Sequence, residues 1–131
     1  PDEPLMVNVV AAEAAQILFL NVSRVLQVCP NGCGHHNTLI RNLLALSAQK
    51  NLNLSRKIFH TSPKTIRGRL LSYLSYQSMR SGSSSFTIPF NRQQLADYLN
   101  VDRSALSNEL SKMQRDGLIQ VERNRFVLLG V

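Results

Sequence analysis

The sequence lacks the features that mark membrane, secreted or disulfide-bonded proteins. Its 131 residues contain no Trp and only two Cys, and aromatic side chains make up 6% of the chain. Two Cys are too few for a disulfide framework. No apolar run approaches the roughly 20 residues that span a bilayer, and the chain opens with no secretory signal pattern. We therefore expect a folded, cytoplasmic protein.

Acidic side chains are also scarce. Asp and Glu number 8 against 15 Lys and Arg, which gives a formal net charge of +7. The imbalance is uneven, because residues 1–36 hold three acidic side chains and one Arg, whereas residues 37–131 hold five acidic and 14 basic ones. A basic surplus of this kind favours a polyanionic partner such as nucleic acid.

The first part of the chain predicts strands that lack partners. Leu5–Ala11 and Gln16–Leu20 are rich in apolar and β-branched residues, so they predict two short strands, and Asn21–Val28 predicts a short helix or an extended connector. Two strands alone are marginal in water. Because the chain begins with Pro-Asp-Glu-Pro-Leu rather than Met, we expect sheet partners upstream of it.

A long helix is predicted from about Asn37 to Lys57, where neither Gly nor Pro interrupts the chain. Its apolar arc is wider than one helix seam and favours packing on two bodies at once, one of them a second copy of the chain. A core helix within one subunit is the alternative. The candidate dimer-interface residues are Leu39, Ile40, Leu43, Leu44 and Leu46.

A second helix is predicted to follow, with Thr61-Ser62-Pro63 as an N-cap and a Pro at the first helical position, ending near Arg80. Residues 81–85 are Ser- and Gly-rich and predict a loop, and Phe86-Thr87-Ile88 predicts a short strand.

The most specific pattern lies between residues 91 and 129. Asn91 and Gln94 form a capping-box pattern ahead of a helix from Arg92 to Leu99. Asp102 is placed to cap another helix, which runs to about Asp116 and ends at Gly117 in a left-handed cap. Both helices carry an apolar stripe toward a core, formed by Leu95, Ala96, Leu99, Leu106, Leu110 and Met113.

Two strand-like segments, residues 118–122 and 125–129, then predict a two-stranded wing. The order helix, turn, helix, wing is that of a winged helix-turn-helix, whose second helix enters the major groove of DNA. Outward side chains of that helix suit base recognition, although any amphipathic helix has a solvated face. The candidate base-reading residues are Arg103, Ser104, Ser107 and Asn108.

The run from Asn91 to Leu99, followed by residues 101–107 and by Asp116-Gly117-Leu118-Ile119, resembles the Crp/Fnr family of bacterial transcription regulators. The resemblance implies a mainly α fold with small β elements. Its expected parts are remnant strands of an effector-binding β-roll (residues 1–35), a dimerisation helix (36–58) and a winged helix-turn-helix domain (59–131). It also implies a homodimer on a palindromic duplex and a contact with RNA polymerase.

By this resemblance, Arg103 matches the family's base-reading Arg. Ser104 stands where Glu is common and Asn108 where a second Arg is frequent, so the resemblance does not fix the preferred half-site. Contacts to the DNA backbone are predicted for Asn91, Gln93, Lys112, Arg123 and Arg125.

No cofactor is predicted for this part of the chain, and the effector is not identified. Residues 1–36 show neither the family's Gly-Glu and Arg-Ser/Thr phosphate cassette for cyclic nucleotides nor a Cys cluster for an iron–sulfur centre. Cys29, Cys33, His35 and His36 are candidates for a metal site, but their spacing favours a turn with structural Cys side chains.

The three His residues have no paired nucleophile motif, and no phosphate-binding Gly-rich loop is present, so we expect a non-enzyme. The competing interpretation is a small-molecule or metal sensor module whose winged helix mainly contacts protein.

Overall fold

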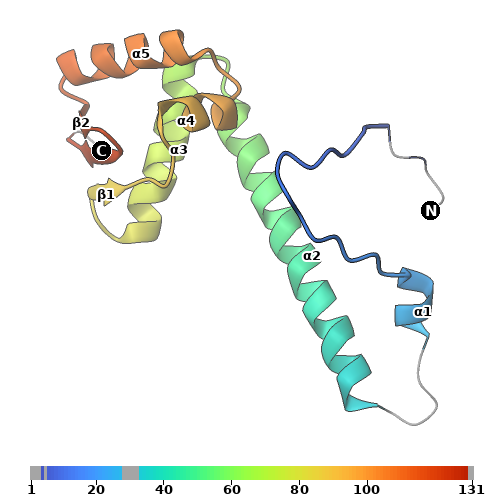
Figure 1. Ribbon diagram of the computed structural model, residues 1–131. Helices are drawn as coiled ribbons and strands as arrows, with labels where there is room; N and C mark the ends of the chain where they lie inside the picture. The colour runs from blue at the N-terminus through green and yellow to red at the C-terminus, as the bar shows by residue number, and fades with distance from the viewer. Residues whose placement is uncertain (1–3, 5, 28–32, 130–131) are drawn as a thin grey trace. The chain divides into compact units, whose positions relative to one another are not determined.

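The computed structural model describes residues 4, 6–27 and 33–129, and the chain divides into two compact units, residues 1–45 and 46–131. The described residues form five helices and one three-stranded antiparallel sheet (Figure 1). This confirms the predicted mainly α fold with small β elements. Within the described ranges, no helix is long and apolar enough to cross a membrane.

Within the described part of the first unit, one short helix, α1 (Val22–Leu26), precedes the long helix. The side chain of Asn21 caps it by accepting a hydrogen bond from the Arg24 amide at 3.1 Å. This confirms the helix alternative for the segment after residue 20. The strands predicted at Leu5–Ala11 and Gln16–Leu20 are wrong, because residues 6–20 form no strand. A strand is stable only beside a hydrogen-bonded neighbour, and none lies within the described residues.

The long helix α2 (Gly34–Thr61) begins earlier and ends later than predicted. Its last turn is extended by hydroxyl groups that satisfy terminal carbonyls: the Thr61 hydroxyl donates to the Lys57 carbonyl at 2.8 Å, and the Ser62 hydroxyl to the Ile58 carbonyl at 2.7 Å. Thr61 therefore closes α2. The prediction that Thr61 and Ser62 cap the following helix is wrong.

The next helix is α3 (Ile66–Ser81), and its N-cap is Thr65, whose hydroxyl accepts a hydrogen bond from the Gly68 amide at 3.0 Å. The turn before it is tight, because a Cβ atom at Gly68 would lie 2.9 Å from the Pro63 Cβ. Only Gly allows Pro63 to approach the first turn this closely. The fully buried side chains of Leu70 and Leu74 then direct α3 into the core.

The sheet contains β1 (Ser85–Thr87), β2 (Ile119–Glu122) and β3 (Arg125–Leu128), in the order β1-β3-β2. The predicted two-stranded wing is confirmed by the antiparallel pairing of β2 with β3, and the short strand predicted at Phe86-Thr87-Ile88 is present one residue earlier as β1. Strand β3 is the central strand: β2 pairs with one of its edges and β1 with the other. The pairing with β1 places Phe86 opposite Phe126. The predicted loop before β1 is correspondingly shorter, since Ser85 already belongs to the strand.

The predicted helices α4 (Arg92–Leu99) and α5 (Arg103–Arg115) are confirmed. Gly117, with φ of +72°, ends α5 as predicted, and the Leu118 amide donates to the Met113 carbonyl at 3.0 Å. The core of the second unit joins α3, α4, α5 and the sheet. All six apolar residues predicted to face it are buried: Leu95, Ala96, Leu99, Leu106, Leu110 and Met113.

Candidate nucleic-acid interface

The N-terminus of α5 is held by the carboxylate of Asp102. One carboxylate oxygen accepts hydrogen bonds from the amides of Ser104 at 2.8 Å and Ala105 at 3.0 Å, and also from the Ser104 hydroxyl. These hydrogen bonds lower the pKa of Asp102 below its ordinary value; the bond from the Ser104 hydroxyl contributes most and the two amides contribute less. The cap therefore stays ionised and fixes the first turn of α5, which carries Arg103.

The outward face of α5 separates into side chains that are engaged within the chain and side chains that are not. Ser104 donates to Asp102, and the Ser111 hydroxyl donates to the Ser107 carbonyl at 3.0 Å. Arg103, Asn108 and Lys112 are exposed and form no hydrogen bond or ion pair with any described residue. Of the four candidate base-reading residues, Arg103 and Asn108 are therefore free to bind, and Ser107 is half-buried.

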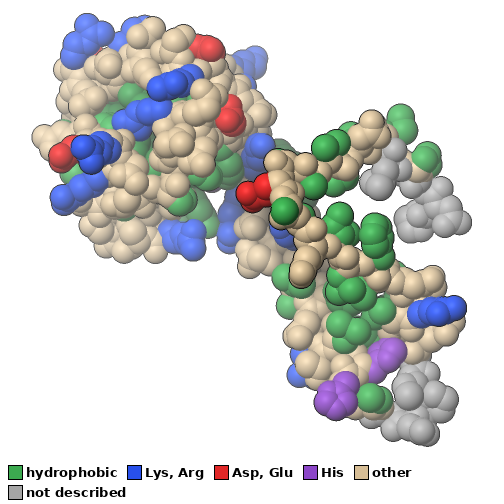
Figure 2. Space-filling view, viewed as in Figure 1, with side chains coloured by type: hydrophobic (Ala, Val, Ile, Leu, Met, Phe, Trp, Pro, Cys, Tyr) green, Lys and Arg blue, Asp and Glu red, His purple; other side chains and the backbone are tan. Residues whose placement is uncertain are grey.

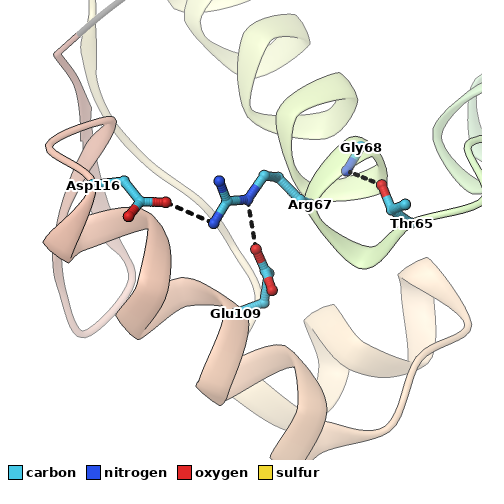
Figure 3. A network of polar contacts seen from close by, with 5 residues as sticks. All are labelled: Thr65, Arg67, Gly68, Glu109 and Asp116. Carbon is cyan, nitrogen blue, oxygen red and sulfur yellow. Dashed lines mark hydrogen bonds and ion pairs between the residues drawn. The ribbon is translucent and has the colours of Figure 1, made fainter.

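Arg67 of α3 fixes α5 from the inner side (Figure 3). Its Nε lies 2.6 Å from a carboxylate oxygen of Glu109, and its Nη2 lies 2.8 Å from one of Asp116. The hydrogen bonds to Glu109 and then to Asp116 raise the pKa of Arg67. This contact neutralises two acidic side chains, one on α5 and one just after its last residue. Sequence analysis missed it, because Arg67 and Glu109 are 42 residues apart and no local pattern links them.

Arg69, also missed, fixes the end of α4. Its Nη1 donates to the carbonyls of Leu99 at 3.0 Å and Asn100 at 2.9 Å, and its Nε donates to the Pro63 carbonyl at 2.9 Å. The last carbonyls of a helix have no partner within the helix, so a guanidinium is a suitable donor for them. The turn between α4 and α5 is therefore held on both of its sides, by Arg69 and by Asp102.

The N-terminus of α4 contains the predicted capping box. The Asn91 side-chain oxygen accepts from the Gln94 amide, and the Gln94 side-chain oxygen accepts from the Asn91 amide, both at 2.9 Å. Asn91 also borders a hollow of about 290 Å³, together with Arg123 of the wing turn. Two of the predicted backbone-binding residues thus lie around one hollow, although they are distant in sequence.

The remaining predicted backbone-binding residues are partly engaged. Gln93 donates to the Asp97 carboxylate at 2.8 Å, and Arg125 donates through Nη2 to the Ser85 hydroxyl at 3.3 Å. Arg92, which was not assigned a role, lies with its guanidinium carbon 5.4 Å from the centre of the Phe126 ring, and burial lowers its pKa. Arg92 therefore packs the wing against α4 rather than projecting into solvent.

Basic side chains outnumber acidic ones in the second unit. Residues 46–131 hold 13 Lys and Arg against five Asp and Glu. Figure 2 shows the Lys and Arg side chains spread over this unit, with only isolated Asp and Glu between them. Since Glu109 and Asp116 pair with Arg67 and Asp102 caps α5, much of the negative charge is already compensated locally.

The candidate metal cluster is only partly described, because Cys29 lies outside the described residues. Cys33 is half-buried, His35 is exposed, and the ring of His36 makes a short hydrogen bond to the Val25 carbonyl. Within the described part of the chain, no three Cys, His, Asp or Glu side chains gather in a way that would hold a metal ion.

Comparison with known proteins shows what the second unit resembles. Residues 68–130 match the model of the Crp-like helix-turn-helix domain. The transcriptional activator protein FnrL of Cereibacter sphaeroides is 31% identical over 75 residues, a match that covers 50% of this chain and 30% of FnrL. The chain therefore spans less than a third of this curated relative. Both matches confirm the predicted Crp/Fnr resemblance.

Proposed function

We propose that this chain is the DNA-binding part of a transcription regulator of the Crp/Fnr type. The observation that carries this proposal is the outward face of α5, where Arg103 and Asn108 are exposed and unengaged on a helix whose position is fixed by Asp102 and Arg67. Arg binds the guanine edge through two hydrogen bonds, and Asn does the same with adenine. The similarity to FnrL, a transcriptional activator, supports the same function.

In this proposal α5 lies in the major groove and the surrounding residues position it on the phosphates. Lys112 is exposed on the same helix, and Asn91 and Arg123 border one hollow. The capping bond uses the side-chain oxygen of Asn91, which leaves its amide nitrogen to donate to a phosphate. Gln93 and Arg125 contact the DNA phosphates after their hydrogen bonds to Asp97 and Ser85 are broken.

We further propose a homodimer formed through α2, acting on a palindromic duplex in the cytoplasm and contacting RNA polymerase. The apolar side chains of Leu44 and Leu46 are 66% and 60% exposed in the single chain, and that of Leu39 is also exposed. Ile40 and Leu43 on the same helix are half-buried. A second copy of α2 would cover this face and place two copies of α5 on two half-sites.

A binding titration tests the proposal, using a duplex selected by the wild-type chain from a random pool and a scrambled duplex. Arg103→Ala should cost about 1 to 3 kcal/mol on the selected duplex and weaken discrimination at one base pair per half-site. Lys112→Ala should weaken both duplexes similarly and lower the salt slope by about one. Arg115→Ala removes the same charge from an exposed position with no assigned contact, and it serves as the control.

The alternative is a sensor module whose winged helix binds protein. It predicts weak duplex binding with no preference for any selected sequence, and equal effects of Arg103→Ala and Arg115→Ala. Either result would refute base recognition by α5.

A further inference from the structure

A second candidate site lies away from the outward face of α5, in a cavity of about 260 Å³ within the unit formed by residues 46–131. Side chains from α2, α3 and α4 line it. They include all three tyrosines of the chain, Tyr73, Tyr76 and Tyr98, and two arginines, Arg56 and Arg80. The volume is slightly below the usual range of about 300 to 1,000 Å³ for small-molecule pockets, so the cavity suits a small metabolite.

One side of this cavity is aromatic. The rings of Tyr73 and Tyr98 have centroids 5.4 Å apart, and that of Phe90 lies 5.2 Å from Tyr98 and 6.1 Å from Tyr73. Clustered ring faces of this kind offer an apolar surface with defined geometry. A compact apolar group would bury its surface against them.

The polar side of the cavity is basic. Arg56 is held with its guanidinium carbon 5.4 Å from the centre of the Tyr76 ring, its Nη1 donates to the Asn53 side-chain oxygen at 3.4 Å, and no Asp or Glu is among the described lining residues. Tyr73 is only 2% exposed, and its hydroxyl is closed to solvent beside the Gln77 side chain. Burial raises the pKa of Tyr73 to about 12, so the hydroxyl stays protonated.

Two arginines without an acidic neighbour, beside several aromatic rings, favour a ligand that is anionic at one end and apolar at the other. We propose that the cavity binds a small organic anion, a carboxylate attached to a compact apolar body. Arg56 and Arg80 would hold the carboxylate, and the half-buried rings of Tyr76, Phe90 and Tyr98 would cover the apolar body. This site is independent of DNA binding, so the two proposals stand or fall separately.

Intrinsic fluorescence tests the proposal directly. The chain has no Trp, and its only three Tyr all line the cavity, so the emission reports on this site alone. We would titrate the whole chain with cyclohexanecarboxylate, which does not absorb where Tyr is excited. The expected result is a saturable change in emission. Cyclohexanemethanol, which has the body without the charge, and inorganic phosphate, which has charge without the body, should give no saturable change.

Three variants separate a built site from adsorption to a basic surface. Arg80→Gln should weaken binding about tenfold, as the loss of a charge-assisted hydrogen bond predicts. Tyr73→Phe should leave binding unchanged, because the hydroxyl that it removes is closed to the cavity. Arg115→Gln, an equal charge loss on α5, should bind as the wild type does.

The proposal is overturned by the absence of a saturable change up to about 10 mM cyclohexanecarboxylate. It is equally overturned if phosphate gives the same response, or if Arg115→Gln and Arg80→Gln weaken binding to the same extent.

Discussion

At the scale of single residues, two arginines of α3 position the helices α4 and α5. Arg67 contacts Glu109 and Asp116 on α5, whereas Arg69 contacts the terminal carbonyls of α4. The two side chains are two positions apart, so they leave different sides of α3 and reach different helices. The geometry of the helix-turn-helix therefore depends on residues that precede it in sequence by more than 20 positions.

We expect Arg67→Gln to lower both the melting temperature and the affinity for DNA. The substitution leaves the carboxylates of Glu109 and Asp116 without their cation, and uncompensated negative charge near α5 repels phosphates. The affinity loss should shrink at high salt. Thermal unfolding and duplex titration at two salt concentrations measure both effects, and Arg115→Gln is the matched charge loss. Equal melting temperatures for the two variants would show that the ion pairs do not position α5.

His60, at the end of α2, should make stability depend on pH. It is buried, its Nδ1 lies 2.9 Å from the Ser72 hydroxyl, and desolvation, with a smaller contribution from Arg56, lowers its pKa below 6.5. The unfolded chain, with the ordinary pKa, then binds more protons than the folded chain. The free energy of unfolding should therefore fall as the pH drops from about 7 to 5.

Denaturant titrations across this pH range measure the effect. In His60→Gln the decline should be smaller, because the titrating group is gone. The exposed His35 provides the control, since His35→Gln should keep the wild-type pH dependence. An identical decline in His60→Gln would mean that other groups produce it.

At the scale of elements, the α4 cap combines a structural and a functional role that substitution can separate. Asn91→Ala should destabilise the fold by about 1 kcal/mol, because it removes the acceptor for the Gln94 amide. Asn91→Asp keeps an acceptor at the N-cap and so should preserve stability, while its negative charge should weaken DNA binding. Denaturation and duplex titration of both variants measure this. Unchanged DNA affinity in Asn91→Asp would remove Asn91 from the backbone-binding set.

Local sequence patterns predicted α4 and α5 with nearly correct ends, because caps, apolar spacing and the stop at Gly117 are all short-range features. The start of α3 was mispredicted, because Thr61 and Thr65 are both suitable caps and only the hydroxyl bond to Lys57 shows that Thr61 ends α2. The pairing of β1 with β3 was missed for another reason. It joins Phe86 to Phe126, a contact that periodicity within either segment does not reveal.

The candidate site was predictable to a similar extent. The exposure of Arg103 and Asn108 follows from the buried stripe on the opposite face of α5. The hydrogen bond from the Ser104 hydroxyl to Asp102 is also local, and base reading by Ser104 stays a prediction. Arg67, Arg69 and Arg92 act over long sequence distances, so their roles needed the structure.

At the scale of the whole molecule, net charge and exposed apolar surface are distributed differently. The basic surplus lies in residues 46–131, whereas large apolar side chains are exposed in both units, for example Val9 and Phe19 in the first and Ile58 and Phe59 in the second. Extensive exposed apolar surface on a folded chain marks an interaction surface. The proposed division is DNA binding in the second unit and association through the first unit and α2.

The last prediction concerns this association. Leu46→Glu should convert the proposed dimer to a monomer, because it places a charge in the apolar arc of α2 that a second copy would cover. Leu46 is already 60% exposed in the single chain, so the fold of each monomer should survive. Ala45→Glu introduces the same charge at an exposed neighbour that the helical period places outside the arc, and it should leave the dimer intact. Analytical ultracentrifugation at several concentrations distinguishes the variants. A monomeric wild-type chain at high concentration, or equal behaviour of the two variants, would show that this face of α2 does not form the dimer.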